Sequence, residues 1–226
     1  MTLFSTLTTI LSFIAILSVA SPVQKRGVAF FNPANGGGSE LDNAGGGGGE
    51  PLNVIISGLS SPAVLTDSGF LNYVRSLGFS QECLGIHSGT PQTANLGDGH
   101  GATNQVTELR QDYGDAGLGT CLESLLGGNH LRMWRQNGPS ANSGALFLAV
   151  SAEKTIFDKH TIASNGYNKG RDTLVNSATG GRTSFGGVRY SATVQSVTGL
   201  ISPGSAGVNH GIAQDGVVKV LTVTIV

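Results

Sequence analysis

The chain has 226 residues, and its 13 Lys and Arg side chains nearly balance its 14 Asp and Glu side chains, so the formal net charge is −1. A chain this close to neutral lacks the basic footprint that binding to nucleic acid or to an acidic membrane requires. Gly accounts for 35 residues and charged side chains for 12 %, which indicates long loops around one core of modest size.

The N-terminal residues resemble an export signal. Residues 3–20 are apolar or small and uncharged, and Ser18 and Ala20 are the small residues that a signal peptidase requires before its cut. We therefore expect a signal peptide over residues 1–20, although a membrane anchor is the alternative for a run of this length. Lys25 and Arg26 then form a dibasic pair that fits a kexin-type processing site, and a solvated charge pair is the alternative.

Cleavage at both places would remove a propeptide over residues 21–26 and release a mature chain that begins at Gly27. No later stretch reaches the ~20 apolar residues that span a bilayer. We expect a secreted, extracellular protein with no membrane span after signal cleavage. Cys83 and Cys121 are the two cysteines, and in an oxidising compartment they predict one disulfide, with two buried free thiols as the alternative.

The first part of the mature chain is rich in glycine. Residues 27–50 include Gly36 to Gly38 and Gly45 to Gly49, which cannot bury apolar surface, and we expect a flexible linker there. A globular domain over residues 51–226 then opens with a buried strand at residues 52–58 and an amphipathic helix within residues 62–79.

Further elements follow along the chain. Residues 83–86 fit a short strand, residues 108–113 and 118–126 fit helical segments, and residues 129–136 alternate as a strand does. The apolar run at residues 145–151 predicts a central strand. The remaining predictions are a helix at residues 167–176 and strands at residues 188–197 and 217–226. Together they indicate a single α+β domain with a mixed β-sheet, two or three packed helices and a β-rich C-terminal part.

One strand carries three side chains that suit a site. His130, Arg132 and Trp134 occupy alternate positions, so they share one face, while Leu131 and Met133 point to the other. Such a face could bind an anion, because Arg offers paired donors and Trp offers a flat surface. The alternative is a solvent-facing strand with Arg stacked on Trp.

The order of four short segments resembles the soluble C-terminal domain of LssY-type proteins. The segments are Asn129 to Trp134, the strand Ala145 to Ser151, His160 to Ile162, and Gly170 to Asp172. The resemblance implies an α+β domain that gathers five side chains in one place and supplies no established reaction. These candidate catalytic residues are His130, Arg132, His160, Arg171 and Asp172.

Other kinds of site find little support in the sequence. His100, His130 and His160 could converge on a metal, but no HExxH, HxH or CxxC spacing supports them, and we predict no metal and no cofactor. No Gly-x-Ser-x-Gly segment indicates a serine hydrolase. His100 and Trp134 remain candidate ligand-binding residues.

Three functions fit these observations. The first, which we favour, is a secreted, monomeric binding protein that acts at a cell surface or on a host, with its ligand unknown. The second is a secreted hydrolase-type enzyme that uses the His, Arg and Asp side chains. The third is a surface-coating structural protein, which the glycine content and the low charge suggest.

Overall fold

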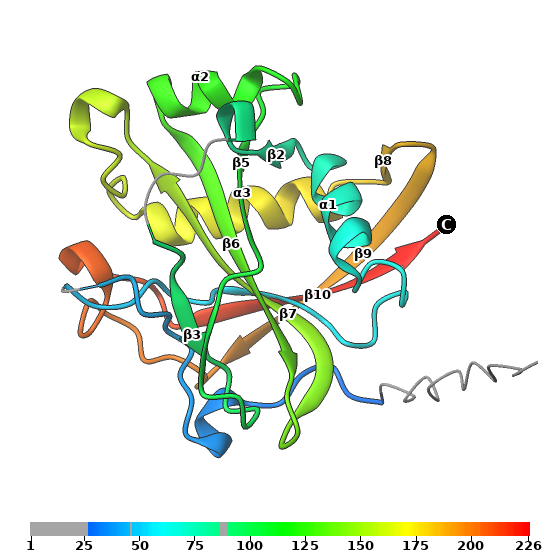
Figure 1. Cartoon of the computed structure of the whole chain (residues 1–226), viewed down its shortest axis with the longest axis vertical. Helices are drawn as coiled ribbons and strands as arrows, with labels where there is room; N and C mark the ends of the chain where they lie inside the picture. Colours follow the sequence, from blue (N-terminus) through cyan, green and yellow to red (C-terminus); the bar gives the residue numbers. More distant parts are fainter. Residues whose placement is uncertain (1–26, 46, 86–89) are drawn as a thin grey trace, which may run out of the picture.

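A computed structural model describes residues 27–45, 47–85 and 90–226 (Figure 1). The expected processing positions Ala20, Lys25 and Arg26 lie outside the described residues. Within the described part of the chain, every helix is too short or too polar to cross a membrane.

A large curled sheet of eight strands forms the centre of the protein. Its strand order is β2-β5-β6-β7-β1-β10-β9-β8, and all neighbours are antiparallel except β1 and β10, which are parallel. In that order the strands are Phe79–Gln81, Thr107–Gln111, Gly128–Asn137, Asn142–Glu153, Val54–Ile56, Val217–Ile225, Val188–Thr198 and Thr183–Phe185. Strands β3 (Thr93–Asn95) and β4 (Ala102–Asn104) pair separately.

Helices and short turns cover the sheet. The helices are α1 (Asp67–Arg75), α2 (Gly119–Leu126) and α3 (Gly166–Thr179), and the 3₁₀ turns are η1 (Pro33–Gly36), η2 (Cys83–Gly85), η3 (Ile156–Asp158) and η4 (Asn209–Gly211). The predicted α+β class, rich in β-structure, is confirmed.

Both faces of the sheet are buried at β7, whereas most residues of β9 are exposed or partly exposed. One face packs against α1 and α3, and there Leu131 and Met133 of β6 join Leu174 of α3 in the larger core. The opposite face contributes Trp134 and Phe147 to a second core. Strand β7 is apolar from Ala145 to Val150 because each of its two faces meets one of these cores there.

Two short elements differ from the expectation. Residues 108–113 were expected to be helical, but residues 107–111 form strand β5, in which Leu109 is buried on one face while Glu108 and Arg110 face a charged cluster on the other. Residues 83–86 were expected to be a strand, and Cys83–Gly85 instead form a 3₁₀ turn. In both places the segment is too short for its periodicity to identify the element.

The glycine-rich segment before residue 51 is packed against the domain, which corrects the expectation of a flexible linker. Leu41 bridges to Pro51, Asn43 bridges to Thr93, and Gly49 bridges to Val208. We call this packed segment, residues 27–45 and 47–50, the N-terminal strap. Its acidic residues are buried: Glu40, Asp42 and Glu50.

The strap glycines permit close backbone contacts. A Cβ atom on Gly36 would lie 1.9 Å from the carbonyl oxygen of Gly97, and one on Gly38 would lie 2.2 Å from the carbonyl oxygen of Asn95. Only a residue without a side chain fits at such distances.

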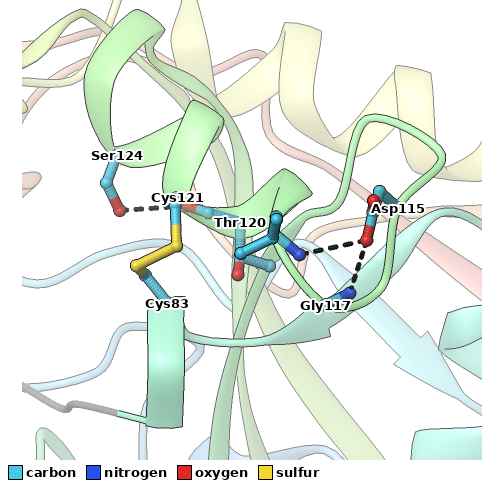
Figure 2. Close-up of a disulfide and its surroundings, with 7 residues drawn as sticks. Cys83, Asp115, Gly117, Thr120, Cys121 and Ser124 are labelled. Carbon is cyan, nitrogen blue, oxygen red and sulfur yellow. Dashed lines mark hydrogen bonds between the residues drawn. A yellow bond between two sulfur atoms is a disulfide. The ribbon is translucent and has the colours of Figure 1, made fainter.

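The predicted disulfide is present between Cys83 and Cys121, and it ties η2 to α2 (Figure 2). Helix α2 begins where Asp115 Oδ1 accepts hydrogen bonds from the backbone N–H groups of Gly117 at 2.8 Å and Leu118 at 3.0 Å. These contacts satisfy donors that precede the first turn of the helix.

Candidate functional site

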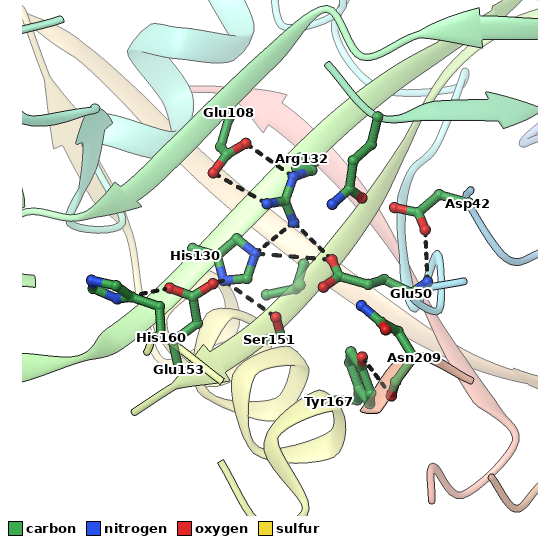
Figure 3. Close-up of polar contacts among 12 residues, drawn as sticks. Asp42, Glu50, Glu108, His130, Arg132, Ser151, Glu153, His160, Tyr167 and Asn209 are labelled. Atoms are coloured by element: carbon green, nitrogen blue, oxygen red, sulfur yellow. Dashed lines mark hydrogen bonds and ion pairs between the residues drawn. The ribbon is translucent and has the colours of Figure 1, made fainter. Parts of the chain in front are cut away.

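Arg132 on β6 lies between carboxylates from two other parts of the chain. Its Nε donates to Glu108 of β5 at 2.9 Å, and one terminal nitrogen donates to Glu50 of the strap at 2.8 Å (Figure 3). The alternation of β6 places Arg132 beside His130, and pairing with β5 brings Glu108 opposite Arg132. The guanidinium is therefore held from both sides by charge-assisted hydrogen bonds.

His130 is completely buried, and both of its ring nitrogens have partners. Arg132 donates to Nε2 at 2.8 Å, and Nδ1 lies 3.2 Å from both Ser151 Oγ and Glu153 Oε1. Burial, followed by the charge of Arg132, lowers the pKa of His130 well below its ordinary value. The ring is therefore neutral, with its proton on Nδ1, where it can donate to Glu153 or Ser151.

This geometry does not match a nucleophilic triad. In a triad, the base faces the nucleophile with one nitrogen and the orienting acid with the other. Here Ser151 and Glu153 share the Nδ1 side of His130, and Arg132 occupies Nε2. The arrangement orients a buried imidazole rather than activating a serine.

A second arginine joins the strands to helix α2. Arg110 of β5 donates to Glu123 of α2 at 3.0 Å, to Glu153 of β7 at 2.9 Å and to Glu108 at 3.1 Å. Glu123 is completely buried, so α2 turns its only acidic side chain inward. We refer to these two arginines, His130 and their carboxylate partners as the buried charged cluster.

The structure brings together three of the five candidate catalytic residues. His160 Nδ1 lies 3.5 Å from Glu153 Oε2, so Glu153 links His160 to His130, which in turn contacts Arg132 (Figure 3). The His160 side chain is 30 % exposed, in contrast to the buried His130.

Arg171 and Asp172 form a separate group. The Arg171 guanidinium donates to Asp172 at 2.8 Å, to Asp215 at 2.6 Å and to the carbonyl of Val217 at 2.7 Å. This pairing lowers the pKa of Asp215 and fixes α3 to the start of β10. Arg171 and its partners therefore stabilise the packing of α3 against the start of β10.

The two candidate ligand-binding residues lie in different environments. Trp134 is fully buried in the second core, beside Leu96 and Phe147, and offers no exposed surface to a ligand. His100 is 47 % exposed on a loop, with Nδ1 3.7 Å from Asp98.

Several acidic residues in this region were not singled out from the sequence. Burial raises the pKa of Glu40 to about 8, and burial together with Glu50 raises that of Asp42 to about 8. Burial likewise raises the pKa of Glu123 to about 7. The alternation of polar and apolar residues around Glu108 and Arg110 could have indicated a strand with a charged face. No pattern in the glycine-rich strap indicated that Glu40, Asp42 and Glu50 are buried.

The charged groups of the buried charged cluster bind one another rather than facing solvent. Its arginines and His130 are engaged by neighbouring protein groups, as is expected of a structural ionic network. Among the described residues, no group of His, Cys, Asp and Glu has the arrangement of a metal site.

The most exposed apolar side chains gather around helix α2. Leu118, Leu122 and Leu125 recur at helical spacing and are 62 %, 46 % and 52 % exposed. Turns η2 and η3 both contact α2. The full set, which we call the apolar end, comprises Leu84, Leu118, Leu122, Leu125, Leu126, Ile156 and Phe157.

Comparison with known proteins found no matching family model, no matching curated protein and no matching solved structure. The resemblance to LssY-type domains therefore stays a prediction.

Proposed function

We propose that the chain is an exported extracellular protein that binds a cell surface, and that the apolar end is the part that contacts lipid. The observation that carries this proposal is the cluster of exposed leucines on α2, together with Phe157, whose side chain is 90 % exposed. Seven such side chains expose on the order of 700 Å² of apolar area, more than the few hundred Å² typical of a monomeric protein surface.

The placement of charge supports a lipid partner. Glu123 of α2 points into the buried charged cluster, which leaves an apolar outer face on the helix. Lys154 and Lys159 are exposed on either side of Ile156 and Phe157, where their ammonium groups could reach lipid phosphates. Because the whole chain is close to neutral, apolar contact would supply most of the binding and these lysines a smaller share.

The size of the apolar end favours lipid over a second copy of the chain. Helix α2 forms one end of the molecule (Figure 1), and turns η2 and η3, which carry Leu84, Ile156 and Phe157, contact it. The apolar area of about 700 Å² is smaller than the ~800 Å² per partner that stable protein pairs bury. A fluid lipid interface can instead surround each protruding side chain.

Vesicle binding tests the proposal directly. The protein is mixed with phosphatidylcholine vesicles, with or without an anionic lipid, and the bound fraction is measured by co-flotation. We expect binding to both vesicle types and a moderate increase with anionic lipid. The double variant Leu122→Ser/Leu125→Ser should lose most of the binding.

Leu59→Ser is the matched control, because Leu59 is 54 % exposed and belongs to the turn after β1. It should bind as the unaltered chain does. Absence of vesicle binding, or concentration-dependent dimers that the double variant abolishes, would rule out the lipid proposal and in the second case favour self-association.

The hydrolase alternative has less support. His130 and Arg132 are engaged by internal partners, and Arg171 with Asp172 braces a different part of the fold. A surface-coating role would require the apolar end to assemble copies of the chain, which light scattering at high concentration would detect.

A further inference from the structure

A cavity of about 370 Å³ opens between the β2–β5 edge of the sheet, the loop after β5 and helix α3. None of its lining residues belongs to the apolar end, although Tyr113 bonds to Gly127 directly after α2, so the cavity lies beside that helix. Its lining combines aromatic, apolar, amide, hydroxyl and carboxylate groups: Leu77, Phe79, Gln111, Asp112, Tyr113, Asn129, Thr173 and Ser177.

Tyr113 is the most unusual residue of this lining. Its backbone has φ of +49°, a left-handed conformation that a residue with a side chain adopts at a cost. Its hydroxyl donates to the carbonyl of Gly127 at 2.7 Å, which fixes the ring, yet the residue remains 46 % exposed. A strained, fixed and exposed aromatic ring beside a cavity is a feature typical of binding sites.

The polar groups of the cavity are arranged for hydroxyl partners. Thr173 and Ser177 are exposed, four residues apart on α3, and so project from the same face of the helix. Asp112 is buried, and among the described residues its Oδ2 accepts one long contact, from Ser80 Oγ at 3.5 Å. The amide of Gln111 also lines the cavity, with its Oε1 held by the backbone of Asn129 at 3.1 Å.

The charge of the lining restricts the ligand. Its described residues include one carboxylate, Asp112, and no Lys or Arg. An anionic ligand would therefore meet an uncompensated negative charge. A ligand ring with one apolar face and several hydroxyl groups fits this lining. The apolar face can pack against the aromatic residues, and the hydroxyl groups can bond to the polar ones.

We propose that this cavity binds a neutral, hydroxyl-rich ring, which is the chemistry of a saccharide unit. The ring would lie against Tyr113, with hydroxyl groups donating to Asp112 and exchanging hydrogen bonds with Gln111, Thr173 and Ser177. A volume of about 370 Å³ accommodates one or two sugar units.

Titration of the isotopically labelled protein tests this by NMR. The probes are glucose, mannose, galactose, N-acetylglucosamine and their β-linked disaccharides, with glucuronic acid as the anionic comparison. At least one neutral sugar should shift the amide signals of residues around Tyr113 and Thr173, and glucuronic acid should bind at least ten-fold more weakly.

Two variants then separate binding from folding. Tyr113→Gly removes the ring and suits the left-handed backbone, and Thr173→Val removes one hydroxyl from an exposed position; each should weaken binding about ten-fold. Asn176→Ala, an exposed change on the same helix outside the lining, should leave it unchanged. The proposal is overturned if no neutral sugar binds, if glucuronic acid binds equally well, or if the control weakens binding as much as the variants do.

Discussion

The Arg132 guanidinium donates to the Glu50 carboxylate at 2.8 Å, across 82 residues of sequence. This contact joins the N-terminal strap to the centre of the sheet. Because the side chains of Arg132 and Glu50 are only 11 % and 5 % exposed, the loss of either one leaves the other largely shielded from water and without its counter-charge.

The first prediction concerns this pair. Arg132→Met should lower the free energy of unfolding by about 3–5 kcal/mol, because Glu50 and Glu108 would remain buried without their shared cation. Urea denaturation followed by fluorescence measures the change. Arg189→Met, on the exposed side of β9, is the control and should change the stability little. A loss below about 1 kcal/mol for Arg132→Met would show that the cluster tolerates an unpaired acid.

The second prediction concerns pH. Burial raises the pKa of Glu40 from 4.5 to about 8, so between these values the folded protein holds a proton that the unfolded chain has released. The contribution of Glu40 to stability is therefore full below about pH 4.5 and is lost as pH rises toward 8.

Glu40→Gln isolates this contribution from those of other groups. The variant should exceed the unaltered protein in stability at pH 8 by a few kcal/mol and by much less at pH 5. Thermal unfolding at both pH values provides the measurement. An equal effect at the two pH values would mean that Glu40 does not titrate in this range.

The third prediction concerns the strap glycines. Gly36→Ala should destabilise the fold by about 2 kcal/mol or more, because the added methyl would collide with the carbonyl of Gly97. Gly181→Ala is the matched control, since no atom lies within 4 Å of its added Cβ. Equal stability of the two variants would indicate that the strap does not pack on the domain in solution.

The fourth prediction concerns the disulfide between Cys83 and Cys121. Replacing both cysteines by Ala should lower the free energy of unfolding by about 4 kcal/mol, as loop closure over 38 residues implies in the chain-entropy model. Amide hydrogen exchange should show the largest loss of protection in α2 and η2. Uniform loss over the sheet would instead assign the bond a global role.

The sequence predicted the long regular elements well. Strand β6 alternates polar and apolar residues, and α3 follows helical spacing. Strand β7 has an unbroken apolar run from Ala145 to Val150, which indicates a strand buried on both faces. The disulfide also followed from composition, because the chain has two cysteines.

The strap and the apolar end could not be derived in the same way. Glycine is equally common in flexible linkers and where backbones approach closely, so Gly36 carried no sign of its contact with Gly97. The spacing of the leucines of α2 predicted a helix, but spacing alone does not show whether the apolar face of a helix is buried or exposed. Similarly, the Arg171 pair with Asp215 depends on a chain reversal that no local pattern specifies.

The parallel pairing of β1 with β10 places Ile55 opposite Val220, so the middle of the sheet is completed by a strand that lies far from β1 in the sequence. A nascent polypeptide that leaves the ribosome in order would have β1 available long before its neighbour is synthesised. Such long-range pairing slows folding and leaves strand edges open in the meantime. Synthesis of β10 would then be the event that permits the sheet to close, and chains that lack β10 would leave β1 and β9 each with an unpaired edge.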